Sequence, residues 1–556
     1  MKHRVRVPLT ALVLGLIFFG GSEALAISPG CAALGGDPLS PPGECQINTL
    51  VTAGSASAFI VPETLHLTST GKIDVAPPGL TVTIGGDLVM DAGSLIDGNV
   101  VNGTGLPITL NVTGDVTLAK PSGLTPGAII RSNSKSGGAI VITSKTGSID
   151  IDGTVESVGT ISGVGAHQPP GGGPITINAA CNLTITPDGK VSSRGFDPGA
   201  DLVHLQGGCK VLIDGLVEST GVGHGVPNNP PNHCDGGALG NRPDKPTNST
   251  ACVEVWAGDF LIIDSTGSNN GQVNADTGGS GGSTGTGWID LFARGDITIK
   301  GDIPATLFDV HANGKSGTND VGGIVTVKST EGKVTTSGKA ISANALGSGG
   351  KGGVVIVEAS ANVDFGTAQI QARGATTGGA PAGGTISARS FNAKVLGLAG
   401  GSVTPHLDAS GDGAARPGSI TLQGCGTLPG TDGVDYPVAE SKPPFTNPGN
   451  ACGGAPSFLP NQPYVQLPNC LCGCFCMSSF FVSSDGLTIT ILGQGLTGVK
   501  EVDFNTNCDP GGIVVTSFTK TDSAITLAFP AGASGKHIIL FNAAAGSSSC
   551  SAALVP

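Results

Sequence analysis

The amino-acid sequence predicts an all-β protein in which a parallel β-helix of about eleven three-stranded coils precedes a small β-sandwich. Three observations predict this fold. The chain of 556 residues contains 92 Gly and 37 Pro, a share far above the ordinary one, which excludes a helix-rich protein. Only 12% of the residues are charged while 38% are apolar, so the chain is not a disordered tail either. One glycine-containing phrase recurs about every 34 residues.

The first 26 residues have the pattern of a secretory signal peptide. A basic start at Lys2, Arg4 and Arg6 precedes an apolar run over 9–19, and Ala24-Leu25-Ala26 ends it. We therefore expect a mature protein that begins at Ile27 and is secreted, either extracellular or on a cell surface. The apolar run is shorter than the roughly 20 residues of a membrane-spanning helix, so we expect no transmembrane segment after signal removal.

Fourteen cysteines in an exported chain indicate disulfides. A bond between Cys31 and Cys45 is expected to staple an N-terminal cap, residues 27–70. On neighbouring coils of a solenoid, Cys209 and Cys252 would come within disulfide reach. The full set of candidate pairs is Cys31 with Cys45, Cys209 with Cys252, Cys181 with Cys234, Cys425 with Cys452, and Cys508 with Cys550.

The repeat consists of three short phrases, and it predicts the β-helix over residues 71–424. The first phrase has glycines followed by alternating apolar residues, as in Gly322-Gly323-Ile324-Val325-Thr326-Val327. The second is Gly with alternating apolar residues, and the third is of the form Val-x-Ser-x-Gly, as at 191–195. Three period-two segments per repeat fit the three faces of a parallel β-helix. A stack of hairpin-built sandwiches is the alternative, but it would not produce a common spacing.

The segment 425–477 is rich in Pro and Cys and is expected to be a linker. Its four alternate cysteines are Cys470, Cys472, Cys474 and Cys476. Three interpretations stay open: a soft-metal thiolate site, disulfides within the linker or to Cys508 and Cys550, and links between molecules that would make the protein self-associate.

Residues 478–556 contain short alternating strands with frequent turns, which indicate an immunoglobulin-like β-sandwich. The strands are Thr488-Ile489-Thr490-Ile491-Leu492 before Gly493-Gln494-Gly495, Val502-Asp503-Phe504, Ile525-Thr526-Leu527-Ala528-Phe529-Pro530, and Ile538-Ile539-Leu540-Phe541-Asn542. In this order they resemble an IPT/TIG domain. The sequence departs from that family where Leu496 replaces a common Phe. The resemblance implies a domain that spaces, docks or binds.

The repeat phrases over 71–424 resemble the right-handed parallel β-helix passengers of exported bacterial haemagglutinin-like and autotransporter-like adhesins. This resemblance implies the β-helix fold, and it favours a structural or adhesive function over an enzymatic one. Polysaccharide lyases and polygalacturonases share the fold, but the ordered motifs of polygalacturonases are missing, and His224-Gly225 stands alone.

Polar residues of the third phrase are expected to form ladders on one solvent-facing side of the rod. They bring Glu218, Asp276, His311, Arg194 and Arg373 onto one face within a few coils. If the protein is an enzyme, these are the catalytic candidates, because carboxylates serve as base or calcium ligands and Arg neutralises a uronate or serves as the base. The alternative is that strand residues facing solvent are polar in any case.

Trp256 and Trp288 have the opposite parity to the inward residues of their strands and are the strongest candidates for a sugar-binding platform. The alternative is that they pack beneath the long insertion between Val211 and Val253.

The composition also argues against several partners. A net charge of −13 excludes nucleic-acid binding through the phosphate backbone. The group of His224, His233, Cys234 and Asp235 fits no zinc pattern, so we expect no metal and no cofactor. The expected function is therefore a secreted or cell-surface structural and adhesive protein, with a cell-surface or extracellular polysaccharide as a candidate partner. A secreted polysaccharide lyase or glycoside hydrolase, and a coat or filament subunit, are the alternatives.

Overall fold

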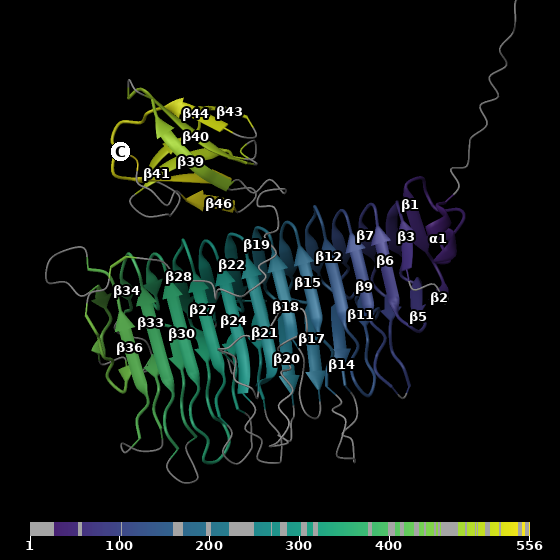
Figure 1. The fold of residues 1–556 in the computed structure, drawn as a ribbon, viewed down its shortest axis with the longest axis horizontal. Coiled ribbons are helices and arrows are strands. Elements are labelled where there is room, and N and C mark those ends of the chain that lie inside the picture. The colour runs from purple at the N-terminus through teal and green to yellow at the C-terminus, as the bar shows by residue number, and fades with distance from the viewer. Residues whose placement is uncertain are drawn as a thin grey trace, which may run out of the picture.

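Three long parallel sheets, each with one strand per coil, form a β-helix, and a small antiparallel domain follows (Figure 1). The computed structural model describes residues 27–53, 58–101, 103–159, 171–195, 202–221, 249–267, 269–277, 286–301, 308–314, 321–375, 381–398, 406–411, 416–426, 433–438, 441–449, 452–453, 456, 476–483, 486–494, 496, 499–505, 512–521, 524–542, 547–550 and 555. The predicted all-β fold class is confirmed. The predicted leader, 1–26, lies outside the described residues.

Sheet A has 13 strands among the described residues, and they follow one another in chain order. They are β1 (Glu44–Ile47), β4 (Thr64–Leu67), β7 (Leu88–Met90), β10 (Val116–Leu118), β13 (Ile149–Ile151), β16 (Leu183–Ile185), β19 (Lys210–Ile213), β22 (Phe260–Asp264), β25 (Ile297–Lys300), β28 (Val334–Ser337), β31 (Val363–Asp364), β34 (Val395–Leu396) and β37 (Val434–Asp435).

Sheet B also has 13 strands in the described ranges. They are β2 (Leu50–Ala53), β5 (Lys72–Val75), β8 (Leu95–Asp97), β11 (Ile129–Arg131), β14 (Thr154–Val158), β17 (Lys190–Gly195), β20 (Leu216–Gly221), β23 (Gln272–Asn274), β26 (Val310–His311), β29 (Lys339–Ser342), β32 (Gln369–Gln371), β35 (Leu407–Asp408) and β38 (Ser441–Lys442).

Sheet C has 12 strands in the part of the chain that the structure describes. They are β3 (Ala58–Val61), β6 (Leu80–Ile84), β9 (Ile108–Val112), β12 (Ile140–Ser144), β15 (Ile175–Ala179), β18 (Leu202–Gly207), β21 (Ser249–Ala257), β24 (Thr286–Ala293), β27 (Ile324–Ser329), β30 (Val354–Ala359), β33 (Thr385–Ser390) and β36 (Ser419–Gln423). The stack thus extends beyond 71–424 at both ends.

Inward-facing residues of equivalent strands stack into one apolar core. In sheet C, for example, Ile140 pairs with Ile108 on one side and with Ile175 on the other, and all three are fully buried. The same period-two alternation of buried and partly exposed residues recurs on strand after strand. Since parallel strands lie about 4.8 Å apart, twelve to thirteen coils make a rod about 60 Å long.

A column of glycines makes the corner between sheets B and C, and it explains the most regular phrase of the repeat. The amide N–H of Gly384 donates to the carbonyl of Ala372 at 2.8 Å, and that of Gly353 donates to Ala343 at 2.8 Å. A Cβ atom on Gly384 would overlap the carbonyl oxygen of Gly353, one coil away. Only glycine leaves room for backbones to approach this closely.

The N-terminal end of the rod is closed by helix α1 (Pro29–Ala33) and by the residues that follow it. Ser28 caps the helix, and the Glu63 carboxylate accepts from both the Ser28 amide at 2.8 Å and the Ser28 hydroxyl at 2.7 Å. The outer edge of β1 is covered because both backbone groups of Gln46 are occupied. The backbone carbonyl accepts from Asp37 N at 2.8 Å, and the backbone N–H donates to Ser40 Oγ at 3.0 Å.

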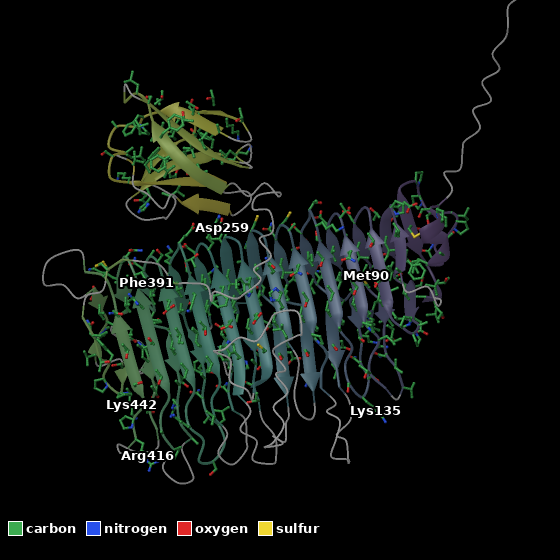
Figure 2. The ribbon with its side chains drawn as sticks, viewed as in Figure 1. Met90, Lys135, Asp259, Phe391, Arg416 and Lys442 are labelled. Atoms are coloured by element: carbon green, nitrogen blue, oxygen red, sulfur yellow. A yellow bond between two sulfur atoms is a disulfide. The ribbon has the colours of Figure 1, made fainter. Side chains whose placement is uncertain are left out.

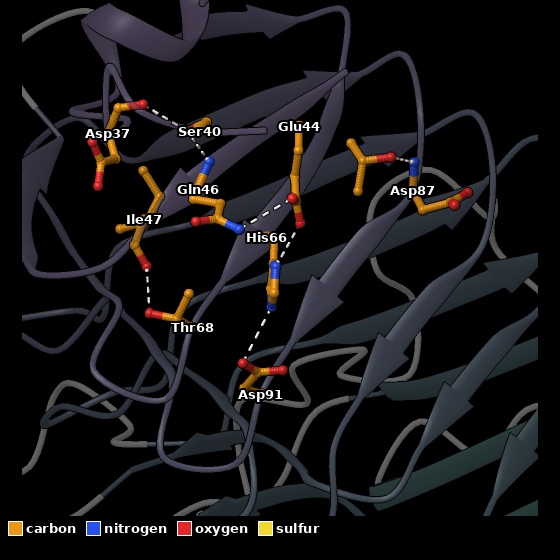
Figure 3. A network of polar contacts seen from close by, with 10 residues as sticks. Asp37, Ser40, Glu44, Gln46, Ile47, His66, Thr68, Asp87 and Asp91 are labelled. Atoms are coloured by element: carbon orange, nitrogen blue, oxygen red, sulfur yellow. Dashed lines mark hydrogen bonds and ion pairs between the residues drawn. The ribbon is translucent and has the colours of Figure 1, made fainter. Parts of the chain in front are cut away.

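A charged network joins the first three coils on the outer side of sheet A (Figure 3). The ring of His66 lies between two carboxylates: Nδ1 is 2.6 Å from Glu44 Oε1, and Nε2 is 3.2 Å from Asp91 Oδ2. Glu44 belongs to β1, His66 to β4, and Asp91 follows β7 directly. Both ring nitrogens of His66 therefore face carboxylate oxygens, one from each neighbouring coil.

Two predicted disulfides, Cys31–Cys45 and Cys425–Cys452, are confirmed (Figure 2). The predicted Cys209–Cys252 bond is wrong: Cys181 and Cys209 are both disulfide-bonded, whereas Cys252 is not part of a disulfide. The register explains this outcome, because Cys252 lies in sheet C opposite Leu202 and Trp288, while Cys209 precedes a strand of sheet A. The other predicted partners, Cys234 and Cys508, lie outside the described residues.

The C-terminal domain consists of two antiparallel sheets that share one apolar core. One contains β39 (Cys476–Val482), β40 (Thr488–Gln494), β44 (Ala524–Ala528) and β43 (Thr519–Lys520). The other contains β42 (Ile513–Val515), β41 (Glu501–Asn505), β45 (His537–Asn542) and β46 (Ser547–Cys550). Ile489 and Ile491 of the first sheet pack in one cluster with Phe504 and Leu540 of the second, as expected for a small sandwich.

The glycine column generates the first prediction. Gly384→Ala is expected to destabilise the rod by roughly 2 kcal/mol or more, because the added methyl group forces successive coils apart. Gly103→Ala is the matched control: its Cβ would meet only Val100 Cγ1, at 3.6 Å. Thermal unfolding followed by circular dichroism measures both variants. Equal melting temperatures for the two would contradict the assigned role of the column.

The Glu63 clamp generates a pH prediction. Burial alone would raise the pKa of Glu63, but the hydrogen bonds from the Ser28 hydroxyl, from its own backbone and from the Ser28 amide outweigh burial and hold the pKa below its ordinary value. A lowered pKa in the folded state means that the clamp stabilises the cap above the ordinary pKa and loses this contribution as pH falls through the lowered one. Glu63→Gln should therefore lower the melting temperature at pH 7 and have little effect at pH 2.5. Thermal unfolding of both proteins in buffers of matched ionic strength measures this. A difference that does not depend on pH would exclude the clamp.

Candidate functional site

The polar ladder predicted from the third phrase runs along the outer side of sheet B. Strand pairing places Glu218 beside Ser192 and Asn274, and His311 beside Asn274 and Ser342. The whole ladder is Glu156, Ser192, Glu218, Asn274, His311, Ser342, Gln371 and Asp408. The predicted register is therefore confirmed at each step.

The prediction that this ladder faces solvent is wrong for its central part. Glu218 is only 7% exposed, His311 2% and Asp276 3%. These side chains have the outward parity, since the residues next to them, Val217 and Val310, fill the core. They are nevertheless enclosed, so each needs a partner for its polar atoms.

His311 and Asp276 form a buried pair across neighbouring coils. His311 ends β26, and Asp276 lies two residues beyond the end of β23. Nδ1 of His311 is 2.9 Å from Oδ1 of Asp276, which also accepts the Asn313 amide at 2.7 Å. Asp276 N in turn donates to Asn274 Oδ1 at 2.7 Å, which fixes the carboxylate.

This geometry orients the imidazole for proton transfer. A carboxylate oxygen accepts a hydrogen bond, so we place a proton on Nδ1, the ring nitrogen that faces Asp276. Nε2 of His311 is buried and has no hydrogen-bond partner within the described part of the chain. A histidine oriented at Nδ1 by a carboxylate has the arrangement of a general base or acid, but the Nε2 of His311 is enclosed.

Glu218 belongs to a different group. Its Oε1 lies 3.1 Å from Lys190 Nζ and 3.7 Å from Arg194 Nε, and it accepts from Ser192 Oγ at 2.7 Å. The strand of Asn274 separates Glu218 from His311, a distance of two coils, or about 10 Å. The charge of the Glu218 carboxylate is neutralised by Lys190 and Arg194 and not by the His311 group.

Arg373 forms a third group. Its Nε lies 3.3 Å from Oδ2 of Asp408. Asparagine side chains link it to the buried pair, because Asn344 Oδ1 accepts from Arg373 N at 2.7 Å and Asn313 Oδ1 accepts from Asn344 N at 2.8 Å. The five predicted residues thus share one face, but the structure gathers them into three groups and does not bring them together at one centre.

The predicted tryptophan platform is wrong. Trp256 and Trp288 do point away from the core, but they are only 3% and 5% exposed. They also lie in different columns: Trp256 pairs with Phe292, with ring centroids 4.8 Å apart, and Trp288 pairs with Cys252. Rings enclosed to this extent offer no face on which a sugar could stack. The insertion beneath which they were expected to pack lies, over 222–248, outside the described residues.

Sequence analysis missed a polar column on the outer side of sheet C, which lies between the column of Trp256 and the column of Trp288. His204, Glu254 and Asp290 are neighbours in the register, and the two carboxylates are only 0% and 1% exposed. Nδ1 of His204 is 3.3 Å from Glu254 Oε2. The signal was present in Val253-Glu254-Val255 and Ile289-Asp290-Leu291, where a carboxylate alternates with two core residues.

No group of three or more metal-ligating side chains lies within the described residues. The predicted cysteine run at Cys470, Cys472 and Cys474, together with the His224, His233 and Asp235 group, lies outside them. None of the helices in the described ranges has the length and apolar character needed to span a membrane. No family model, no curated protein and no solved structure matches the chain.

Proposed function

We propose that this protein is an exported structural and adhesive rod that presents the outer sides of its three sheets to extracellular or cell-surface polysaccharide. The observation that supports this most is the unbroken strand pairing from β1 to β37 in sheet A, with equivalent pairing in sheets B and C. Outward positions thereby recur at a fixed spacing along one axis, which suits the display of successive contacts to a polymer.

The covered ends of the rod favour this function over a filament built by strand addition. At the N-terminal end, Asp37 and Ser40 occupy the backbone groups of Gln46 that another strand would need. At the C-terminal end, Thr446 exchanges hydrogen bonds with Ile420 and Leu422 of β36, the last strand of sheet C. Covered edges are a common device against association through strands.

The C-terminal sandwich supports the same proposal. Its strand sequences resemble the IPT/TIG domains, and it has two sheets of four strands among the described residues. In our proposal this domain spaces or docks the rod and takes no part in chemistry. Secretion, which the N-terminal pattern predicts, would place both parts outside the cell.

The proposal predicts binding without turnover. Mature protein, residues 27–556, should bind intact cells or immobilised polysaccharides reversibly, and its binding should survive His311→Gln. Biolayer interferometry on a panel of neutral and acidic polymers, together with a cell-binding assay, measures this. Absence of binding to every cell and polymer, with circular dichroism verifying the fold, would reject the adhesive function.

A second candidate function, polysaccharide cleavage, is favoured by one specific observation. His311 is oriented by Asp276, and its buried Nε2 has no hydrogen-bond partner among the described residues. In such an enzyme His311 would take a proton from the sugar or from water, and Asp276 would hold the ring in position. Glu218 and Arg373 would bind substrate charges only after leaving their present partners.

Release of reducing ends separates the two functions. We expect no sustained release from any polymer, with or without calcium. If release does occur and His311→Gln reduces it by about 10²-fold or more, cleavage is the function. His66→Gln, which changes a histidine in the N-terminal network and leaves sheet B intact, is the matched control for that result.

A further inference from the structure

The outer side of sheet C differs between its two halves. In the central part its outward residues are buried and include Trp256, Trp288 and two carboxylates. Nearer the N-terminus the outward residues are partly exposed and uncharged. We call this second region the threonine–asparagine array; it consists of Thr81, Thr83, Thr109, Asn111, Val141, Thr143, Thr176 and Asn178, from β6, β9, β12 and β15.

The array has two straight columns. Thr83, Asn111, Thr143 and Asn178 are paired in register in one column, and Thr81, Thr109, Val141 and Thr176 in the other. Neighbouring members of a column are one coil, or about 4.8 Å, apart. Because the intervening residues of each strand are fully buried, both columns point away from the core.

The polar groups of the array are not used inside the protein. In the described residues, the hydroxyls of Thr81, Thr83, Thr109, Thr143 and Thr176 and the amide of Asn111 make no side-chain hydrogen bond with the chain. Asn178 adds a second observation, because its Oδ1 is buried and has no partner among the described residues. A buried acceptor without a partner is rare in folded proteins.

The outer sides of sheets A and B, in contrast, carry charged residues in this part of the rod. On sheet B, Asp97 and Arg131 form an ion pair at 2.7 Å. On sheet A, His66 is held by Glu44 and Asp91, and burial raises the pKa of Asp150, which also lies near Asp152 and Asp115. Among the described residues of these coils, sheet C offers an uncharged outer surface with available donors and acceptors, whereas sheets A and B carry charges.

We propose that the threonine–asparagine array is the contact surface for a neutral, hydroxyl-rich polysaccharide. This inference rests on the proposed adhesive function and identifies the face and the class of polymer. Hydroxyl and amide groups donate and accept, as sugar hydroxyls do, and the absence of charge removes any preference for uronates or sulfated chains. Individual contacts are weak, so binding depends on their repetition along a polymer.

The test compares variants that introduce one charge into an outward threonine. Thr109→Glu and Thr143→Glu change the array, while Thr298→Glu changes a partly exposed outward threonine of β25 in sheet A and is the matched control. Thr109→Val removes only the hydroxyl and guards against a folding defect. Binding of residues 27–556 to insoluble cellulose and chitin, with alginate as the acidic polymer, is measured by depletion, and melting temperatures verify the fold.

We expect the unaltered protein and Thr298→Glu to bind a neutral polymer equally, and Thr109→Glu and Thr143→Glu to bind about tenfold or more weakly. Thr109→Val should lie between them. Equal binding by all variants, or binding to alginate alone, would overturn the assignment of this face and leave the adhesive function standing. Failure to bind any polysaccharide would also overturn it, while the cell-binding assay decides the adhesive function separately.

Discussion

Hydrogen bonding between equivalent strands of successive coils imposes a spacing of about 4.8 Å, and the other features of the rod depend on it. The glycine column at the corner of sheets B and C follows, because glycines such as Gly353 and Gly384 leave room for two backbones to approach this closely. The continuous apolar core follows as well, since each inward residue meets its equivalent one coil away. Ion pairs between coils, such as Lys328 with Glu358 at 3.1 Å, use the same spacing on the outside.

The fold was predictable because the spacing leaves a trace in the sequence at every coil. Glycine pairs, inward Val and Ile, and the polar ladder through Glu218 and His311 all follow from a short repeat, so register could be assigned without coordinates. Burial of the ladder could not be predicted, since alternation distinguishes inward from outward residues and does not tell what covers the outward ones. For the same reason Trp256 was expected on the surface, and the pairing of Arg373 with Asp408 was not expected.

Inward and outward residues of each strand are under different physical constraints. Inward positions tolerate exchange among Val, Ile and Leu, because they need only fill the core. Outward positions differ from coil to coil and from sheet to sheet, with charges on sheet B, a buried acidic column in the middle of sheet C, and neutral hydroxyls near its N-terminal end. The outward columns are therefore what distinguishes one part of the rod from another.

The direction of the inter-coil hydrogen bonds has a mechanical consequence. These bonds run along the long axis, so tension applied to the two ends pulls each of them directly and does not shear one strand past another. Coils would then detach one at a time from the loaded end, and the force needed would be set by a single coil-to-coil interface. Lengthening such a rod extends its reach but adds nothing to the load it can bear.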